Sequence, residues 1–379
     1  VLVEALGVRG TLAAAGSTAL LVGLLAALVA RFAPKGALES KSSVRRSCER
    51  SKEAKKPVPG QTTAPLSPQL FRLVLLAFAV TGFCSLAYEV LWTRILIFVL
   101  TTSVYSFATM LTTFLAGIAI GSFLSARFLV PRIGRPLLWF GGIEILAGVT
   151  VLLSVVMLAN LEAIDYSLVA RLGRFGERGM IQARFLDTFV VLFIPTFLMG
   201  AAFPVVLKTS LTDRARIGVR VGQLYAANTI GCVLGAFAGG LVLMPLLGTH
   251  RSLLFVVALN FAVGVLFVWK ALPARRTAVR YVTAGTAAVV SVTALVLIPS
   301  NIFYRTINTH HHPSQIVEMI EHPTGTVTVH RFATGERLLA VDGVNVAGDN
   351  FMLRSTQKLQ GYIPLILHPD PKKVVQIGF

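Results

Sequence analysis

Carboxylates and amides inside long apolar segments are the residues of this sequence most able to do chemistry. Glu144 lies well inside such a segment without an obvious local partner. Because a charge in hydrocarbon is costly, it indicates transport or proton relay unless a neighbouring helix satisfies it. Glu89 and Arg94, near the end of another segment, are interpreted as a snorkelling or interhelical ion pair. The same interior could be lined by three more polar residues, Asp187, Asn228 and Asn260.

A second candidate lies in the last residues of the chain. Residues 372–378 read as a buried strand that follows a Pro-Lys-Lys entry and ends on a glycine. A nucleotide-binding βαβ unit begins in this way, because its glycines let a cofactor approach the backbone. Gly378 is therefore the candidate cofactor-binding residue, and the sequence stops at Phe379 before a glycine-rich loop is complete.

No metal site is predicted. The adjacent side chains of His310–His312 cannot easily all point at one ion, so they are interpreted as a polar loop where the chain leaves the membrane. Cys48 lies in a polar linker, while Cys84 and Cys232 lie in apolar segments, where a thiol is usually a small hydrophobe. Their spacing matches no metal or disulfide framework.

The composition indicates a membrane protein. Hydrophobic residues make up 55% and charged residues 14% of the 379, whereas soluble domains average about 45–50% and about 25%. The 35 Lys and Arg outnumber the 17 Asp and Glu, but they lie in short loops between apolar segments, where orientation signals belong. This pattern argues against nucleic-acid binding and makes the lipid bilayer the first partner.

Eight apolar segments are long enough to cross a bilayer as helices, which takes about 20 residues. They are 11–32, 70–92, 105–129, 136–158, 184–208, 221–246, 252–271 and 279–299. Residues 33–69, rich in Lys, Arg, Ser and Pro, are predicted to be a disordered basic linker. The expected fold class is mostly α, a polytopic helical membrane bundle.

Basic residues gather in three loops that fall on one side of the membrane, together with the linker, if every segment spans. By the positive-inside rule this side is cytoplasmic. Residues 300–379 are then placed outside, unless 279–299 is re-entrant. The three loops contain Arg127, Arg132 and Arg135; Lys208, Arg214, Arg216 and Arg220; and Lys270, Arg275, Arg276 and Arg280.

The sequence repeats at an offset of 114 residues. Each unit holds three helices, so the second copy is predicted to be inverted, an architecture known from transporters. Small residues four apart indicate close helix packing, with a substrate path along the groove as the alternative. The matching pairs are Gly117 and Gly231, Gly121 and Gly235, Ser125 and Gly239, Pro131 and Pro245, and Gly134 and Gly248.

These features divide the chain into segments, and the sequence reads as a fragment truncated at both ends. Five residues between Val1 and Gly23 match residues between Val242 and Gly264 at an offset of 241, and residues 1–32 are interpreted as the last helix of an upstream unit. The expected divisions are 1–32, the linker 33–69, the first repeat 70–158, a polar loop 159–183, the second repeat 184–271, the final membrane helix 272–299, a β-rich region 300–371 and a truncated strand 372–379.

Residues 300–371 are predicted to form a small soluble region. Residues 326–330 alternate as a strand does, 337–341 form a second candidate strand, and 333–336 supply the turn of a hairpin. Residues 352–366 are predicted to form a helix.

The motifs together resemble a family. Leu339-Ala340-Val341-Asp342-Gly343 and the segment from Gly361 through His368-Pro369-Asp370-Pro371-Lys372-Lys373 to Gly378 resemble the spermidine synthase pattern. Gly82–Arg94 and Gly222–Gly231 are similar to bacterial proteins that fuse a major-facilitator-like membrane region to a spermidine-synthase-like domain. The resemblance covers nearly the whole chain apart from the linker.

The resemblance implies a bacterial inner-membrane protein with a Rossmann-like aminopropyltransferase domain, whose acidic catalytic residues would follow Phe379. It implies decarboxylated S-adenosylmethionine, or S-adenosylmethionine, as cofactor and a polyamine or other small amine as partner. Asp342 and Gln357 are the candidate site residues of the soluble part. The Tyr-His-Glu of classical synthases is replaced by Gln357, Lys358 and Leu359, which puts the amine specificity in doubt.

Three functions remain open at this point. The first is a membrane-anchored enzyme of the spermidine-synthase type, in which this fragment lacks the catalytic core. The second is a major-facilitator-like transporter of a small solute with a regulatory or degenerate soluble domain. The third is a structural membrane protein. The sequence leaves the oligomeric state open.

Overall fold

The computed structural model of this chain describes Ser17 and residues 67–100, 104–159, 168, 170–171, 176–210, 217–298, 314–322 and 324–375. Five expectations lie outside the described residues: the segment 11–32 apart from Ser17, the linker before residue 67, the loop residues Arg214 and Arg216, the loop His310–His312 and the cofactor glycine Gly378. The helices and strands with described bounds belong to one compact unit, Ala64–Phe379.

The described part is mostly helical, as expected from the sequence. Six of its helical segments are long and apolar enough to span a membrane, which is consistent with a polytopic membrane protein. The helices are α3 (Pro68–Leu100), α4 (Val104–Leu124), α5 (Pro136–Ala159), α7 (Glu177–Ser210), α8 (Ile217–Ala238), α9 (Met244–Ala271), the short η6 (Ala274–Arg276), α10 (Thr277–Leu297) and α12 (Phe351–Leu367).

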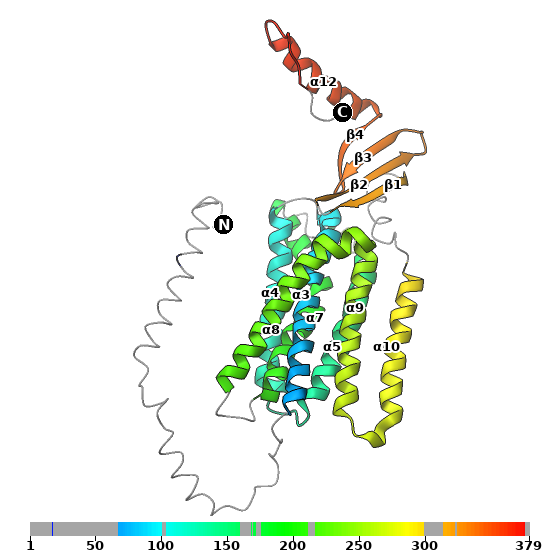
Figure 1. The fold of residues 1–379 in the computed structure, drawn as a ribbon. Helices are drawn as coiled ribbons and strands as arrows, with labels where there is room; N and C mark the ends of the chain where they lie inside the picture. The colour runs from blue at the N-terminus through cyan, green and yellow to red at the C-terminus, as the bar shows by residue number, and fades with distance from the viewer. Residues whose placement is uncertain are drawn as a thin grey trace, which may run out of the picture. The chain divides into compact units, whose positions relative to one another are not determined.

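The longest apolar segment, Ile217–Ala271, contains two helices. It is broken at Gly248, whose backbone has φ 76° and ψ 165°. A residue with a Cβ is strained there, so glycine allows the break. Figure 1 shows α8 leading up to this point and the rest of α9 leading back along the bundle. The predicted separation of 221–246 from 252–271 is therefore confirmed.

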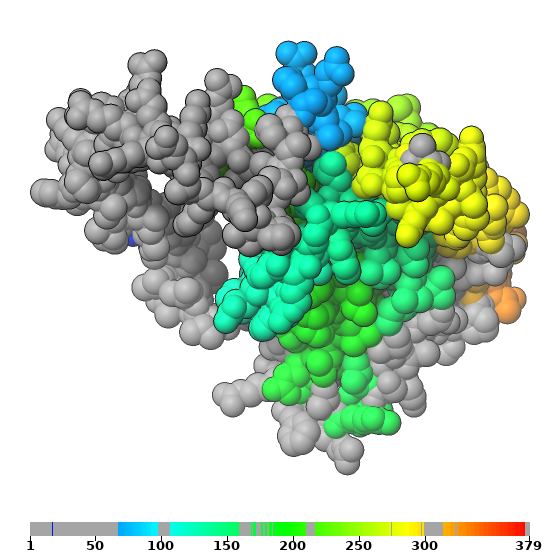
Figure 2. Space-filling model, turned by 90° about the horizontal axis from the view of Figure 1, so that it is seen from below, coloured from blue at the N-terminus to red at the C-terminus, as the bar shows by residue number. Residues whose placement is uncertain are grey.

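The described parts of the basic loops lie at one end of the bundle. Lys208, near the end of α7, donates a hydrogen bond from Nζ to the carbonyl of Ile133, just before α5, at 2.7 Å. Arg220, at the start of α8, lies over the ring of Phe71, at the start of α3, 5.2 Å from the ring centroid. The end of α9 packs on the start of α5 at Gly141. Figure 2 views the molecule from this end, with the start of α3 and the α9–α10 connection in view.

Two helix pairs form the centre of the bundle: α4 packs along α7, and α3 packs along α8. Ser125 donates a hydrogen bond from Oγ to the carbonyl of Ala201 at 3.0 Å. Gly239 lies against Ala87, so residues separated by 114 positions from the first pair make the corresponding contact. The same offset relates two π-helical turns that follow α4 and α8, η2 (Ser125–Leu129) and η5 (Gly239–Leu243).

Glycines bring these helices into backbone contact. A Cβ at Gly121 would lie 2.0 Å from the carbonyl oxygen of Phe197, and a Cβ at Gly235 would lie 2.1 Å from that of Phe83. Both distances are far shorter than van der Waals contact, so no side chain fits at either position. The packing interpretation of the two glycine motifs is confirmed, because the glycine faces are filled by a neighbouring helix.

The soluble part is an antiparallel sheet in the order β1-β2-β3-β4. The predicted hairpin is confirmed, since β2 and β3 pair through a turn in which Phe332 N–H donates to the Glu336 carbonyl at 2.9 Å. Two further strands were not predicted. Asp342 and Gly343, with φ of 49° and 79°, form the tight turn from β3 to β4, a conformation that Asp-Gly favours. The strands are β1 (Ser314–His322), β2 (Gly325–Phe332), β3 (Arg337–Val341) and β4 (Val344–Gly348).

The predicted helix at 352–366 is confirmed as α12. It begins after Asn350, whose Oδ1 accepts a hydrogen bond from Leu353 N–H at 2.9 Å, a standard N-cap. The strand predicted from residue 372 is wrong as far as the structure describes it, because 371–375 have no regular secondary structure. These residues are exposed, and a strand requires a partner strand to pair its backbone groups.

We predict that Gly121→Ala and Gly235→Ala each destabilise the bundle by about 1–3 kcal/mol, because the added methyl must push two backbones apart. Gly142→Ala is the matched control, since its Cβ would meet nothing within 4 Å. Thermal unfolding of the purified protein in detergent measures the difference. Equal melting temperatures for the three variants would contradict the proposed backbone contact.

Candidate functional site

Glu144 is the central buried carboxylate of the bundle. Its side chain is 2% exposed, and the hydroxyl of Thr81 on α3 donates a hydrogen bond to its Oε1 at 2.9 Å. Among the described residues, Oε2 has no hydrogen-bond partner although it is fully buried. One carboxylate oxygen therefore accepts a hydrogen bond from a neighbouring helix, and the other has no hydrogen-bond partner among the described residues.

The position of Glu144 follows from the packing of α5 on α9. A Cβ at Gly141 would lie 2.7 Å from the carbonyl oxygen of Gly264, and a Cβ at Gly148 would lie 2.6 Å from the ring of Phe261. Glu144 lies between these two glycines on α5, so it belongs to the stretch where the helices are closest. This packing holds the carboxylate in protein and away from lipid.

Further polar groups come from α3 and α9. Cys84 donates a long hydrogen bond from Sγ to the carbonyl of Val256 at 3.7 Å. Asn260, one turn after Val256 on α9, is 2% exposed. Thr81, Cys84 and Tyr88 lie three and four residues apart, which places them on one face of α3.

Asp187 and Asn228 do not join this cluster. Asp187 is fully buried on α7, but it lies 21 residues before Lys208, which is at the basic end of the bundle. Glu144 is only eight residues into α5 from that end. With a rise of 1.5 Å per residue, the two carboxylates are roughly 20 Å apart along the bundle. Asn228 instead packs against Gly82 on α3.

The predicted pairing of Glu89 with Arg94 is wrong. Arg94 Nη1 lies 4.0 Å from Oδ1 of Asp342 in the soluble sheet, and Glu89 is half-buried on the same helix. Residues five apart on an α-helix lie about 140° apart around its axis, so their side chains diverge. Among the described residues, no ion pair joins Glu89 to Arg94.

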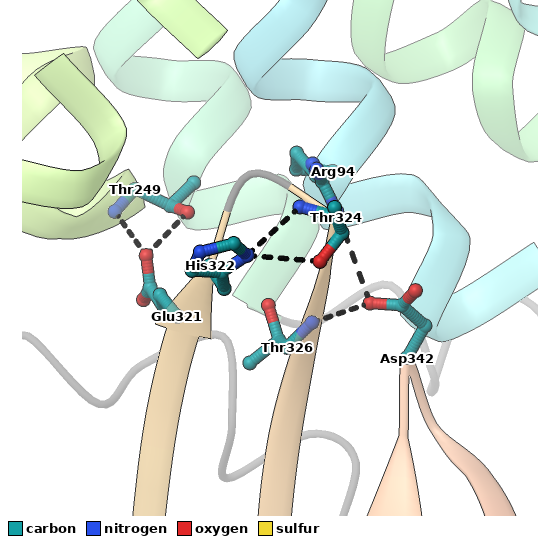
Figure 3. A network of polar contacts seen from close by, with 7 residues as sticks. All are labelled: Arg94, Thr249, Glu321, His322, Thr324, Thr326 and Asp342. Carbon is teal, nitrogen blue, oxygen red and sulfur yellow. Dashed lines mark hydrogen bonds and ion pairs between the residues drawn. The ribbon is translucent and has the colours of Figure 1, made fainter. Parts of the chain in front are cut away.

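Two acidic side chains tie the sheet to the helices (Figure 3). Oε2 of Glu321, on β1, accepts hydrogen bonds from the backbone N–H and the hydroxyl of Thr249, at 2.6 Å and 2.8 Å. These are free donors at the start of a helix, because Thr249 follows the break at Gly248. Asp342 accepts a hydrogen bond from Thr326 N–H at 2.8 Å and also faces Arg94.

The two residues predicted for the soluble site are not brought together. Asp342 lies in the β3–β4 turn and Gln357 lies on α12, and no hydrogen bond joins them in the described part of the chain. A different polar group occupies the sheet: His330 is buried, with Nε2 2.9 Å from the hydroxyl of Thr328 and Nδ1 3.3 Å from that of Ser314. It lines a shallow cleft on the sheet.

Several of these residues escaped the sequence analysis. Thr81 is 63 residues from Glu144, and Thr249 is 72 residues from Glu321. Contacts over such separations leave no trace in local periodicity. The glycine before Thr249 could have indicated a helix break there. The helical spacing of Tyr88 from Cys84 and Thr81 could have placed it on the same face of one helix.

The chain was compared with known proteins. No family model matches it, and neither a curated protein nor a solved structure matches it.

We predict that Glu321→Ala loosens the sheet at the start of α9. Losing a helix cap costs about 1 kcal/mol, which corresponds to roughly fivefold faster local opening. Hydrogen exchange followed by mass spectrometry should show faster exchange in 249–252 and in β1. Glu318→Ala, at an exposed position of the same strand, should leave both regions unchanged, and the same acceleration in both variants would refute the capping role.

Proposed function

We propose that this chain belongs to a membrane-embedded protein of the spermidine-synthase-like type, in which the bundle carries a soluble aminopropyltransferase-type domain. The observation that supports it most is the succession at the end of the chain: strand β3, the Asp342-Gly343 turn, strand β4, helix α12 and then His368 to Lys373. The spermidine synthase pattern follows the same order. The chemistry would be transfer of an aminopropyl group from decarboxylated S-adenosylmethionine to a small amine.

In this proposal the described residues support the domain and do not catalyse. Asp342 is used in a turn and in the ion pair with Arg94. Lys358 and Leu359 stand where the amine substrate would be held, and neither favours it, since a lysine repels a cation and a leucine cannot balance its charge. In the proposal, a Rossmann-like domain binds the cofactor and its acidic residues carry out the catalysis.

The test is aminopropyl transfer by the natural full-length protein. Purified protein is incubated with decarboxylated S-adenosylmethionine labelled in the aminopropyl group and with putrescine, and we expect labelled spermidine. The same incubation without putrescine controls for hydrolysis. Absence of transfer to any small amine, together with absence of cofactor binding in equilibrium dialysis, would overturn the proposal.

We also propose that α3–α5 and α7–α9 are inverted repeats, with the basic end in the cytoplasm of a bacterial inner membrane. The corresponding contacts of Ser125 and Gly239 and the two π-helical turns support the repeat. The shared basic end supports the orientation. The sheet follows α10, which begins at the basic end, so the orientation places the sheet outside.

The orientation predicts which exposed cysteines can be labelled in intact cells. In a background without Cys48, Cys84 and Cys232, Glu336→Cys in the β2–β3 turn should react with a membrane-impermeant maleimide. Arg276→Cys, between α9 and α10, should react only after lysis. The reverse pattern would show that the sheet is cytoplasmic.

A second candidate function is transport of a small solute through the bundle. The buried carboxylate of Glu144 favours it, because an ionisable group is retained inside a membrane bundle at a cost. Inverted three-helix repeats are also found in transporters. Comparing uptake by vesicles that contain wild-type protein or Glu144→Gln tests this candidate, and equal uptake would mean that the carboxylate is not used in transport.

A further inference from the structure

One carboxylate oxygen of Glu144 has no hydrogen-bond partner among the described residues. This oxygen, Oε2, is fully buried, while Oε1 accepts a hydrogen bond from Thr81. An ionised carboxylate without a partner is very unfavourable in a low-dielectric interior. Something must therefore neutralise or bind this oxygen whenever the group is buried.

Two neighbouring helices, α3 and α9, carry further buried oxygen atoms without a hydrogen-bond partner among the described residues. They are Oη of Tyr88 on α3 and Oδ1 of Asn260 on α9. Tyr88 lies two helical turns after Thr81, on the face of α3 that contacts Glu144. Asn260 lies one turn from Val256, which contacts Cys84 on the same face of α3. Carboxylate, phenol and amide oxygens from α5, α3 and α9 are all able to accept from, or coordinate, a cation.

Among the described residues, no ion pair involves Glu144. Arg94 pairs with Asp342 and Lys372 with Asp370, both in or at the soluble part. The titratable side chains on the α3 face that contacts Glu144 through Thr81 are Cys84 and Tyr88, and both are neutral in their ordinary state. From α9 comes the uncharged amide of Asn260, and on α7 the carboxylate Asp187 lies near the opposite end of the bundle.

The packing also limits what can enter. Gly141 and Gly264 bring the backbones of α5 and α9 together on one side of Glu144, and Phe261 fills the space beside Gly148 on the other. A large solute has no room between these helices. A ligand at this site must be small and must carry a positive charge.

We infer that Glu144, with Tyr88 and Asn260, forms a binding site for a monovalent cation between α3, α5 and α9. The ligand is a proton, an alkali cation or a small protonated amine, which share a single positive charge. The inference deepens the second candidate function, transport, by naming the chemical class of the bound species. It is independent of the synthase-like domain.

The site is tested by carbodiimide labelling, because dicyclohexylcarbodiimide reacts with protonated carboxyls in apolar surroundings. Purified full-chain protein in detergent is labelled across a pH series, with and without NaCl or putrescine, and the modified residue is identified by peptide mass spectrometry. We expect labelling of Glu144 that falls as pH rises. Protection by Na⁺ or putrescine at fixed pH identifies that cation as the ligand, and pH dependence without protection identifies the proton.

Labelling that is independent of both pH and cations would overturn the inference, because it would describe a permanently protonated structural acid. Absence of labelling at every pH would overturn it as well, because the carboxyl would never be protonated. Glu144→Gln serves as the unlabelled control, and Glu89, half-buried on α3, serves as a matched carboxyl in the same sample. These readouts use wild-type protein, so they stand even where a variant fails to fold.

Tyr88→Phe tests the composition of the site, since it removes a single oxygen and keeps the ring stacked on Trp92 at 5.3 Å. A hydrogen bond to a charged group is worth about 1.5–3 kcal/mol, so half-protection should need at least roughly tenfold more cation. Where the proton is the ligand, the pH at which labelling is half-maximal should shift. An unchanged curve would remove Tyr88 from the site.

Vesicle uptake is a separate readout: intact cation binding without uptake would reject transport and keep the site.

Discussion

Backbone-to-backbone contact at glycines is the constraint on which this bundle depends. Lipid is as apolar as a leucine side chain, so helices in a membrane associate by close packing and by polar contacts. Gly121 approaches the carbonyl of Phe197, and Gly235 approaches that of Phe83, at distances that exclude any side chain. These contacts set the spacing of α4 on α7 and of α3 on α8, and the remaining helices are arranged around them.

The same spacing explains where the polar groups lie. With α3 held against α8, the face of α3 that carries Thr81, Cys84 and Tyr88 is turned to α5 and α9, where Glu144 and Asn260 are buried. At the end of the bundle opposite the basic loops, the sheet contacts both α3 and α9: Asp342 faces Arg94 on α3, and Glu321 caps α9 at Thr249. A movement of α3 relative to α9 would therefore strain or break one of these contacts.

In the soluble part, local sequence patterns predicted some of the strands and helices but not others. The alternation in 325–332, the turn around Gly335 and the helix after Asn350 are all local signals, and the hairpin and α12 were predicted from them. Strand β1 was missed because a register shift between Ile316 and Glu318 interrupts its alternation, and β4 was missed because it contains an asparagine and ends on a glycine. Val374 and Val375 are β-branched residues typical of a strand, but a strand forms only where a partner pairs with it.

The sequence by itself determined the helical class, the positions of the apolar segments, the basic loops and the choice of Glu144 as the carboxylate to explain. These properties depend on composition and on spacing along one helix. Only the tertiary structure decided that Glu144 meets Thr81, that Arg94 turns to Asp342 and away from Glu89, and that Asp187 lies far along the bundle. Those partners are separated by tens to hundreds of residues, and packing between helices, which no local pattern encodes, brings them together.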